Sequence, residues 1–204
     1  MADSPIPHFR IAWRAFKTHS GLFVASILVL FASWAALEVA VIALHRLGVL
    51  LDVLLHLAFL LFFSGLTAGL IVISLEVLSG RAPDFGTLFR SLHRGPQFLL
   101  AFLLYTFGAA LGLMLLVVPG IYFAVRYALF APVLATTHSS ALQSLRKAAA
   151  LSQGCWWLIF LFLLRLFLLN LLGAAFLGLG LLITVPVSVL ATASLYRSFV
   201  EAGL

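Results

Sequence analysis

The stretch FLLAFLLYTFGAALGLMLLVVPGIYFAVRYALFAPVLATT, residues 98–137, decides the fold, because it is apolar almost throughout and is punctuated by Pro119-Gly120. Its forty residues are about twice the ~20 that an α-helix needs to cross a bilayer core about 30 Å thick. Proline ends a helix and glycine permits a tight reversal, so we expect a transmembrane hairpin with its turn at Pro119 and Gly120. A single kinked helix is the alternative, but it would be too long for one crossing.

The composition of the whole chain extends this interpretation. Of the 204 residues, 64% are hydrophobic and 9% are charged, whereas soluble domains are about half apolar and about a quarter charged. The apolar runs are long and rich in leucine rather than alternating, which favours helices over a closed barrel. The first run is too long for a secretory signal, and no small-residue cleavage site follows it. We therefore expect an all-α, polytopic membrane protein, with residues 1–204 forming a single integral membrane domain.

Six apolar segments mark the expected transmembrane helices, and they pair in sequence as three hairpins. The second segment is long enough to tilt or to project beyond the bilayer. The six segments are Leu22–Leu44, Val49–Leu78, Phe98–Val118, Ile121–Thr137, Trp156–Leu172 and Leu177–Tyr196.

The basic residues predict the orientation of these segments. Nine of them fall on one side, namely Arg10, Arg14, Lys17, Arg81, Arg90, Arg94, Arg146, Lys147 and Arg197. The loops on the opposite side carry Arg46 alone. The positive-inside rule then places both termini in the cytoplasm. The net charge of +6 predicts contact with anionic lipid headgroups on that side. Nucleic acid is not an expected partner, because no soluble domain presents a basic face.

Each of the three basic stretches on that side has the pattern of an amphipathic helix that lies in the membrane interface. The apolar faces are Phe9, Ala12, Trp13 and Phe16 in the first; Phe85, Leu88, Phe89 and Leu92 in the second; and Leu142, Leu145 and Ala149 in the third. Asp84 can cap the second helix, and Ser140 with Gln143 forms a capping box for the third.

A glycine follows each of these stretches, at Gly21, Gly95 and Gly154, and a span follows each glycine. We interpret this as three copies of one unit, a basic amphipathic interfacial helix followed by a transmembrane hairpin. The alternative is that any short loop of a membrane protein has this appearance.

Several short motifs between residues 69 and 196 resemble a known family. They are Asp84-Phe85, Leu88-Phe89, Val118-Pro119-Gly120-Ile121-Tyr122, Arg126-Tyr127, Ala131-Pro132-Val133, Ala141-Leu142, Ser144, Leu151, Gly154, Pro186 and Tyr196. The chain resembles the YciC-like family of uncharacterised bacterial membrane proteins, which is similar to the membrane domain found ahead of some glycerophosphodiester phosphodiesterases. The resemblance implies six spans and a bacterial inner-membrane location, and it implies no particular activity. The phosphodiesterase chemistry is not carried over, because these residues contain no counterpart of that catalytic domain.

The sequence contains none of the common catalytic patterns. There is no phosphate-binding Gly-Lys-Ser/Thr loop, no His-Glu-x-x-His and no Gly-x-Ser-x-Gly. His45 and His56 could bind a metal together with Asp52, but polar helix ends near headgroups are the plainer interpretation of these residues. Cys155 is the single cysteine, so no intrachain disulfide can form. We therefore expect no catalytic, cofactor-binding or metal site, and a protein that is not an enzyme.

Charged groups inside spans are costly and are the remaining functional candidates. We expect Glu38 and Arg126 to form an ion pair in the outer leaflet, with Asp52 as the second candidate partner of Arg126. Arg165 falls close to the midplane, at a depth similar to that of Tyr105. Arg165 either has a structural role, bonded to backbone carbonyls or to Tyr105, or lies on a pathway for a substrate or a lipid headgroup.

Two Gly-x-x-x-Gly motifs, at Gly65/Gly69 and Gly108/Gly112, allow close helix approach, either within this bundle or in a homo-oligomer. Taken together, these features predict a non-enzymatic inner-membrane protein that acts as an envelope scaffold or as an accessory subunit of a membrane complex. The alternative is a transporter or lipid-handling protein that uses the charges inside its spans.

Overall fold

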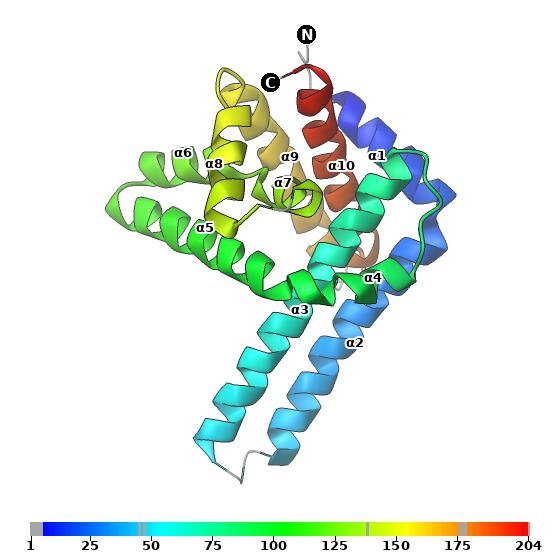
Figure 1. Ribbon diagram of the computed structural model, residues 1–204, viewed down its shortest axis with the longest axis vertical. Helices are drawn as coiled ribbons and strands as arrows, with labels where there is room; N and C mark the ends of the chain where they lie inside the picture. Colours follow the sequence, from blue (N-terminus) through cyan, green and yellow to red (C-terminus); the bar gives the residue numbers. More distant parts are fainter. Residues whose placement is uncertain (1–5, 45, 47, 138, 176–178, 204) are drawn as a thin grey trace.

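The computed structural model describes residues 6–44, 46, 48–137, 139–175 and 179–203. This part of the chain folds into α-helices and one 3-10 helix, with no strand (Figure 1). The elements are α1 (Ile6–Thr18), α2 (Ser20–Leu44), α3 (Val49–Leu78), α4 (Gly86–Arg90), the 3-10 helix η2 (Ser91–Arg94), α5 (Gly95–Leu115), α6 (Val117–Tyr127), α7 (Phe130–Thr136), α8 (Ala141–Leu151), α9 (Trp156–Ala175) and α10 (Leu181–Glu201).

The helical content of the described chain confirms the all-α prediction, and six of its helical segments are long and apolar enough to cross a membrane, the number predicted. The segments are Ser20–Leu44, Val49–Leu78, Gly86–Leu115, Val117–Thr136, Trp156–Ala175 and Leu181–Glu201. The expected start of the last span, Leu177, lies outside the described residues.

The chain reverses between the third and fourth spans at Leu116, and not at Pro119-Gly120 as predicted. Leu116 is extended, with φ −164° and ψ 147°, and separates α5 from α6. Pro119 is the third residue of α6, where a missing N–H costs no intrahelical hydrogen bond, so proline is compatible with the first turn. Gly120 serves close packing instead, because a Cβ on the facing Gly112 would lie 2.8 Å from the Cα of Gly120.

The glycines of α3 provide a closely packed contact surface for residues 86–94, which precede α5. A Cβ at Gly69 would lie 2.6 Å from the Cα of Leu88, and a Cβ at Gly65 would lie 2.8 Å from the Cα of Leu92. Leu88 is fully buried there. The Gly65/Gly69 motif therefore packs against α4 and η2 of the same chain. Residues 86–94 continue into α5 through Gly95, which has helical dihedral angles and does not end a helix as expected.

The fourth span is two helices rather than one. Ala128 and Leu129 interrupt it, and α7 follows as a separate helix of seven residues. Leu129 and most of α7 are buried among α3, α5, α8 and α10. Arg94 donates a hydrogen bond from Nη1 to the carbonyl oxygen of Ala135 at 2.8 Å, which satisfies one of the last carbonyls of α7. This interruption of a transmembrane helix is tolerated because the surrounding helices enclose the backbone at that point.

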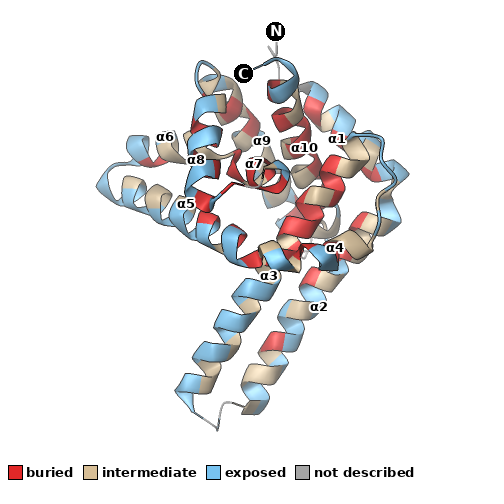
Figure 2. Ribbon diagram, in the orientation of Figure 1, coloured by how far each residue is buried: buried red, intermediate tan, exposed pale blue. Residues whose placement is uncertain are grey.

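The start of α1 and the end of α10 lie together at one end of the molecule, which we call the terminal end (Figure 1). There α1 packs on α10, and the last turn of α3 lies beside them. From the central core, α2 and α3 extend as a pair in one direction and α5 and α6 as a pair in another (Figure 1). Figure 2 shows that the outer halves of α2 and α3 are mostly exposed, whereas α7 and α10 hold much of the core.

The buried faces of α1, α4 and α8 differ in part from the predicted apolar stripes. On α1, Phe16 is buried as expected, but Trp13 is 43% exposed and carries Lys17 over its ring. On α8, Leu145 is buried and Leu142 is 52% exposed, because Ala141, Ser144 and Ala148 complete the packed face in its place.

In the second stretch, Leu88 is buried, Phe85 and Leu92 are half-buried, and Phe89 is exposed. The small residues of α3 accommodate Leu88 directly, so Phe89 is left on the outer side of α4.

The two ends that the sequence located best are those of α8. Ser140 and Gln143 form the predicted capping box. Gly154, with φ +77°, adopts the left-handed conformation between α8 and α9. In contrast, Gly21 lies inside α2.

Candidate functional site

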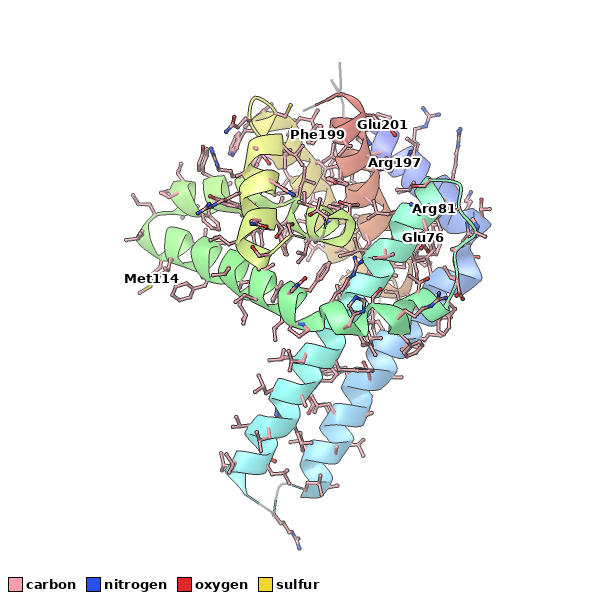
Figure 3. All side chains as sticks on the ribbon, viewed as in Figure 1. Glu76, Arg81, Met114, Arg197, Phe199 and Glu201 are labelled. Atoms are coloured by element: carbon pink, nitrogen blue, oxygen red, sulfur yellow. The ribbon has the colours of Figure 1, made fainter. Side chains whose placement is uncertain are left out.

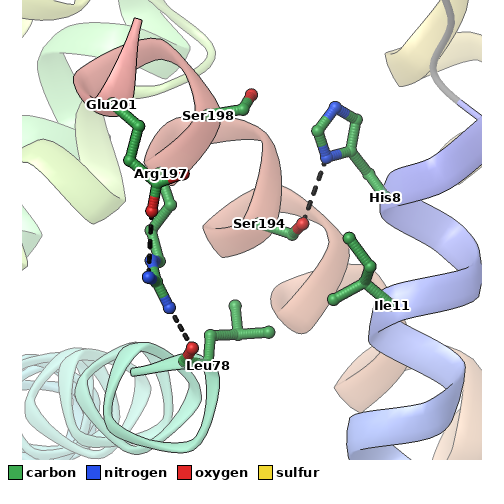
Figure 4. Close-up of a pocket in the computed structure, with 7 residues that line it drawn as sticks. All are labelled: His8, Ile11, Leu78, Ser194, Arg197, Ser198 and Glu201. Carbon is green, nitrogen blue, oxygen red and sulfur yellow. Dashed lines mark hydrogen bonds and ion pairs between the residues drawn. The ribbon is translucent and has the colours of Figure 1, made fainter. Parts of the chain in front are cut away.

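A polar cavity of about 240 Å³ lies at the terminal end between α1, α3 and α10 (Figure 4). Its polar lining is His8 from α1 together with Ser194, Arg197, Ser198 and Glu201 from α10. Arg197 donates through Nη1 to the carbonyl oxygen of Leu78 and through Nη2 to Glu201 Oε1, the latter at 2.9 Å. Its guanidinium therefore links the end of α3 to α10.

His8, like Ser194, Ser198 and Glu201, was not predicted from the sequence as a residue of this site. It is buried, and its Nδ1 lies 3.1 Å from Ser194 Oγ on α10. Burial lowers the pKa of His8 below its ordinary value of 6.5. The neutral imidazole therefore holds α1 against α10. The available signal was spacing, because His8 precedes Ala12 and Phe16 by four and eight residues and shares their helical face.

Charged side chains gather around this cavity. Figure 3 shows Glu76, Arg81, Arg197 and Glu201 at the terminal end, whereas Met114 marks the tip of the α5–α6 pair. Glu76 Oε2 is buried and has no hydrogen-bond partner among the described residues. Within the cavity, His8 pairs with Ser194 and Arg197 pairs with Glu201 and with the carbonyl of Leu78, an arrangement that joins α1, α3 and α10.

Two apolar cavities lie on either side of α7. One of about 270 Å³ is lined by α3, α5 and α7, and includes Ser64 and Thr67. The other, of about 190 Å³, is lined by α3, α7 and α10. Ile71 and Ala131 line both cavities, so these two side chains form the partition between them.

The predicted ion pair of Arg126 with Glu38 or Asp52 is wrong. Arg126 instead donates from Nη1 to the hydroxyl of Tyr122 on its own helix at 2.6 Å. Tyr122 in turn stacks on Trp156, the first residue of α9. Because α6 packs against α5, α8 and α9, Arg126 lies near the start of α9 and far from the outer end of α2.

Arg165 and Tyr105, the proposed pathway residues, are not brought together. Tyr105 is half-buried, and its hydroxyl donates to the carbonyl oxygen of Ala124 at 3.2 Å. Arg165 is exposed on α9, and among the described residues it has no hydrogen-bond or ion-pair partner. It lines none of the three cavities described above.

The other candidate residues predicted from the sequence either have contacts within the chain or lie outside the described residues. A Cβ at Gly108 would collide with the ring of Phe123, so the second glycine motif packs α5 against α6. His56 Nδ1 lies 2.7 Å from the carbonyl oxygen of Asp52, and His45 is outside the described residues. Within the described ranges, no three His, Cys, Asp or Glu side chains converge as metal ligands would.

The six apolar helices and the large exposed apolar surface define the class: this is a multi-pass α-helical membrane protein. Comparison with protein-family models, curated proteins and solved structures finds no match.

Proposed function

We propose that the protein is a non-enzymatic scaffold or accessory subunit of a larger assembly in the bacterial inner membrane. The observation that carries this proposal is the divergence of the α2–α3 and α5–α6 pairs from their shared core (Figure 1). Helices that form a transport pathway would be expected to close around it. Here the two helix pairs instead diverge, and their sides are open to contact with lipid or with other membrane proteins.

The outer part of the α2–α3 pair supports a role in assembly. Its exposed side chains are large and apolar, and include Trp34, Ile42, Leu50 and Leu57. Lipid tails are as apolar as these side chains, so no hydrophobic force holds two such helices together in a bilayer. Packing against the helices of a partner would supply the van der Waals contacts that this part of the pair lacks.

The surface charges support attachment to anionic lipid at the terminal end. Arg10, Arg14 and Lys17 are exposed on α1, opposite its packed face, and Arg146 and Lys147 are exposed on α8. Basic groups beside an anionic leaflet are worth about 1 kcal/mol each. By the positive-inside rule this end is cytoplasmic. In this proposal α1 and α8 are basic interfacial helices ahead of the first and third pairs of spans, whereas α4 packs on the glycines of α3 and belongs to the third span.

Extraction without detergent tests this proposal. The protein would be released from its native membrane in polymer nanodiscs, and the copurifying proteins quantified by mass spectrometry. We expect a membrane protein in fixed ratio, which is lost when Trp34 and Ile42 are both changed to alanine. Ile11→Ala, on the exposed face of α1, is the matched control and should leave the ratio unchanged. Recovery of the protein with lipid alone would contradict the proposal.

Lipid handling is the second candidate, and the two apolar cavities beside α7 favour it. Each would accept part of an acyl chain, with the hydroxyls of Ser64 and Thr67 as polar groups in the larger one. Ala131→Phe would project a ring from the partition between the cavities. If lipid handling is the function, this change should abolish retention of a fluorescent phospholipid by the purified protein, while Ala109→Phe, on α5 outside the cavity lining, should not.

A further inference from the structure

Arg165 is exposed on α9 and indicates what kind of partner the protein binds. This inference rests on the assembly role proposed above. Arg165 is the tenth of the twenty residues of α9, from Trp156 to Ala175. At 1.5 Å per residue, it lies roughly 14 Å from the first residue of the helix and roughly 15 Å from the last. An arginine side chain is shorter than either distance. Its guanidinium therefore stays within the apolar part of the helix and does not reach a lipid phosphate at either end.

The surroundings of Arg165 are apolar. The same face of α9 exposes Leu164, Phe167, Leu168, Leu171 and Leu172. Among the described residues, nothing accepts a hydrogen bond from the guanidinium. The other arginine within the fourth or fifth span, Arg126, has the Tyr122 hydroxyl. Charged residues inside membranes almost always face a bundle interior and pair there. Arg165 faces outward from this chain. The helix bundle in which its guanidinium finds a partner must therefore include a helix of another chain.

We infer that the Arg165 face of α9 binds a transmembrane helix of another protein that carries a carboxylate near its own midpoint. Charge complementarity decides the chemistry, because a carboxylate offers the guanidinium paired, charge-assisted hydrogen bonds. A second copy of this chain does not supply such a group. Of the acids in the described spans, Asp52, Glu76 and Glu201 lie within one turn of a helix end, and Glu38 lies six residues, roughly 9 Å, from the end of α2 and not at its midpoint.

A model peptide tests this inference directly. The probe is a 20-residue leucine–alanine transmembrane peptide with glutamate at position ten, labelled with a fluorophore. The full-length protein, carrying an acceptor dye, is reconstituted with it in phosphatidylcholine vesicles, and association is followed by energy transfer. The matched peptides carry leucine at position ten, or glutamate at position three.

The wild-type protein should bind the position-ten glutamate peptide about tenfold more tightly than either matched peptide, given one to two interhelical hydrogen bonds. Arg165→Leu should remove this preference, and Arg165→Lys should retain part of it. Arg146→Leu, at an exposed basic position of α8 outside the spans, is the matched control and should bind like the wild type. Arg165→Met serves as a second neutral variant if Arg165→Leu does not fold.

Three results would overturn the inference. The first is equal binding of the three peptides by the wild type, and the second is an undiminished preference in the neutral variants. The third is self-association of the wild type without peptide that is lost in Arg165→Leu, which would assign the face to a second copy. If any of these three results is found while a partner still copurifies in nanodiscs, the proposed assembly role stands, but the partner does not bind at the Arg165 face. If no partner copurifies but the peptide binds, the assembly role fails alone.

Discussion

Arg126 illustrates how a charged residue in a span can be satisfied locally. Tyr122 lies one helical turn earlier, accepts a hydrogen bond from the guanidinium and places its ring 5.8 Å from Cζ. Pairs four residues apart share one face of a helix, so this contact could have been predicted from the sequence. The expected partner, Glu38, was chosen by depth alone, and depth does not say which helices are neighbours.

The first prediction separates these two accounts of Arg126. Tyr122→Phe removes the acceptor and leaves the guanidinium without a side-chain partner, so the folded yield in membranes should fall. Glu38→Gln and Arg126→Gln should act independently, because residues without a shared contact have additive effects, within about 0.5 kcal/mol. Folded yield can be measured by fluorescence-detected size exclusion of the three single variants and of the double variant Glu38→Gln/Arg126→Gln. Recovery of the Arg126→Gln loss by Glu38→Gln would restore the ion-pair account.

His8 leads to a prediction about pH. Its pKa in the folded protein is lowered by burial, so the unfolded state binds the proton more readily. The stability that the neutral ring contributes is therefore present above pH 6.5, its ordinary pKa, and is lost as pH falls through the lower folded pKa. After correction for the intrinsic rate, hydrogen exchange of α1 should be faster at pH 5 than at pH 7.

His8→Gln is the control for this effect. It retains a polar side chain opposite Ser194 but does not titrate, so its exchange in α1 should be the same at both pH values after correction for the intrinsic rate. Equal pH sensitivity of the wild type and His8→Gln would show that His8 does not set the response.

At the scale of elements, the helix types were predictable and their partners were not. Hydrophobic length predicted the spans, and the capping box predicted the start of α8. The reversal at Leu116 was missed because proline in a first helical turn has the same sequence appearance as proline in a turn. The Gly65/Gly69 motif signalled close approach, but nothing in its spacing identifies Leu88 and Leu92 as the residues that approach.

The contact between α3 and α4 gives the third prediction. Gly69→Ala would place a Cβ 2.6 Å from the backbone of Leu88, and overpacking of this kind costs about 1–3 kcal/mol. Gly21→Ala is the matched control, because Gly21 is also helical and has nothing within 4 Å of the added atom. Gly21→Ala should be neutral or stabilising by about 0.5–1 kcal/mol.

Thermal unfolding in detergent would measure both changes. The melting temperature should fall for Gly69→Ala and should stay or rise for Gly21→Ala. A loss of similar size in both variants would mean that α4 does not sit on the glycines of α3.

At the scale of the whole molecule, the sequence predicted a helical membrane protein with six spans, and it could not predict the divergence of the helix pairs. Length and hydropathy are local properties, whereas the angle between α2–α3 and α5–α6 depends on contacts among α3, α5 and α7. Arg165 was singled out from its depth, but its outward direction requires knowledge of which face of α9 packs against α10 and α6.

Cysteine accessibility measures the central claim, that six spans place both termini on the same, cytoplasmic side. In a Cys155→Ala background, single cysteines would replace Arg46 and Leu116 at the outer tips, and Gln153 and Ala202 at the terminal end; all four positions are exposed. An impermeant thiol reagent added to intact cells should label the first two, and should label the last two only after the membrane is opened. Labelling of Gln153 or Ala202 in intact cells, with Arg46 and Leu116 protected, would contradict the account.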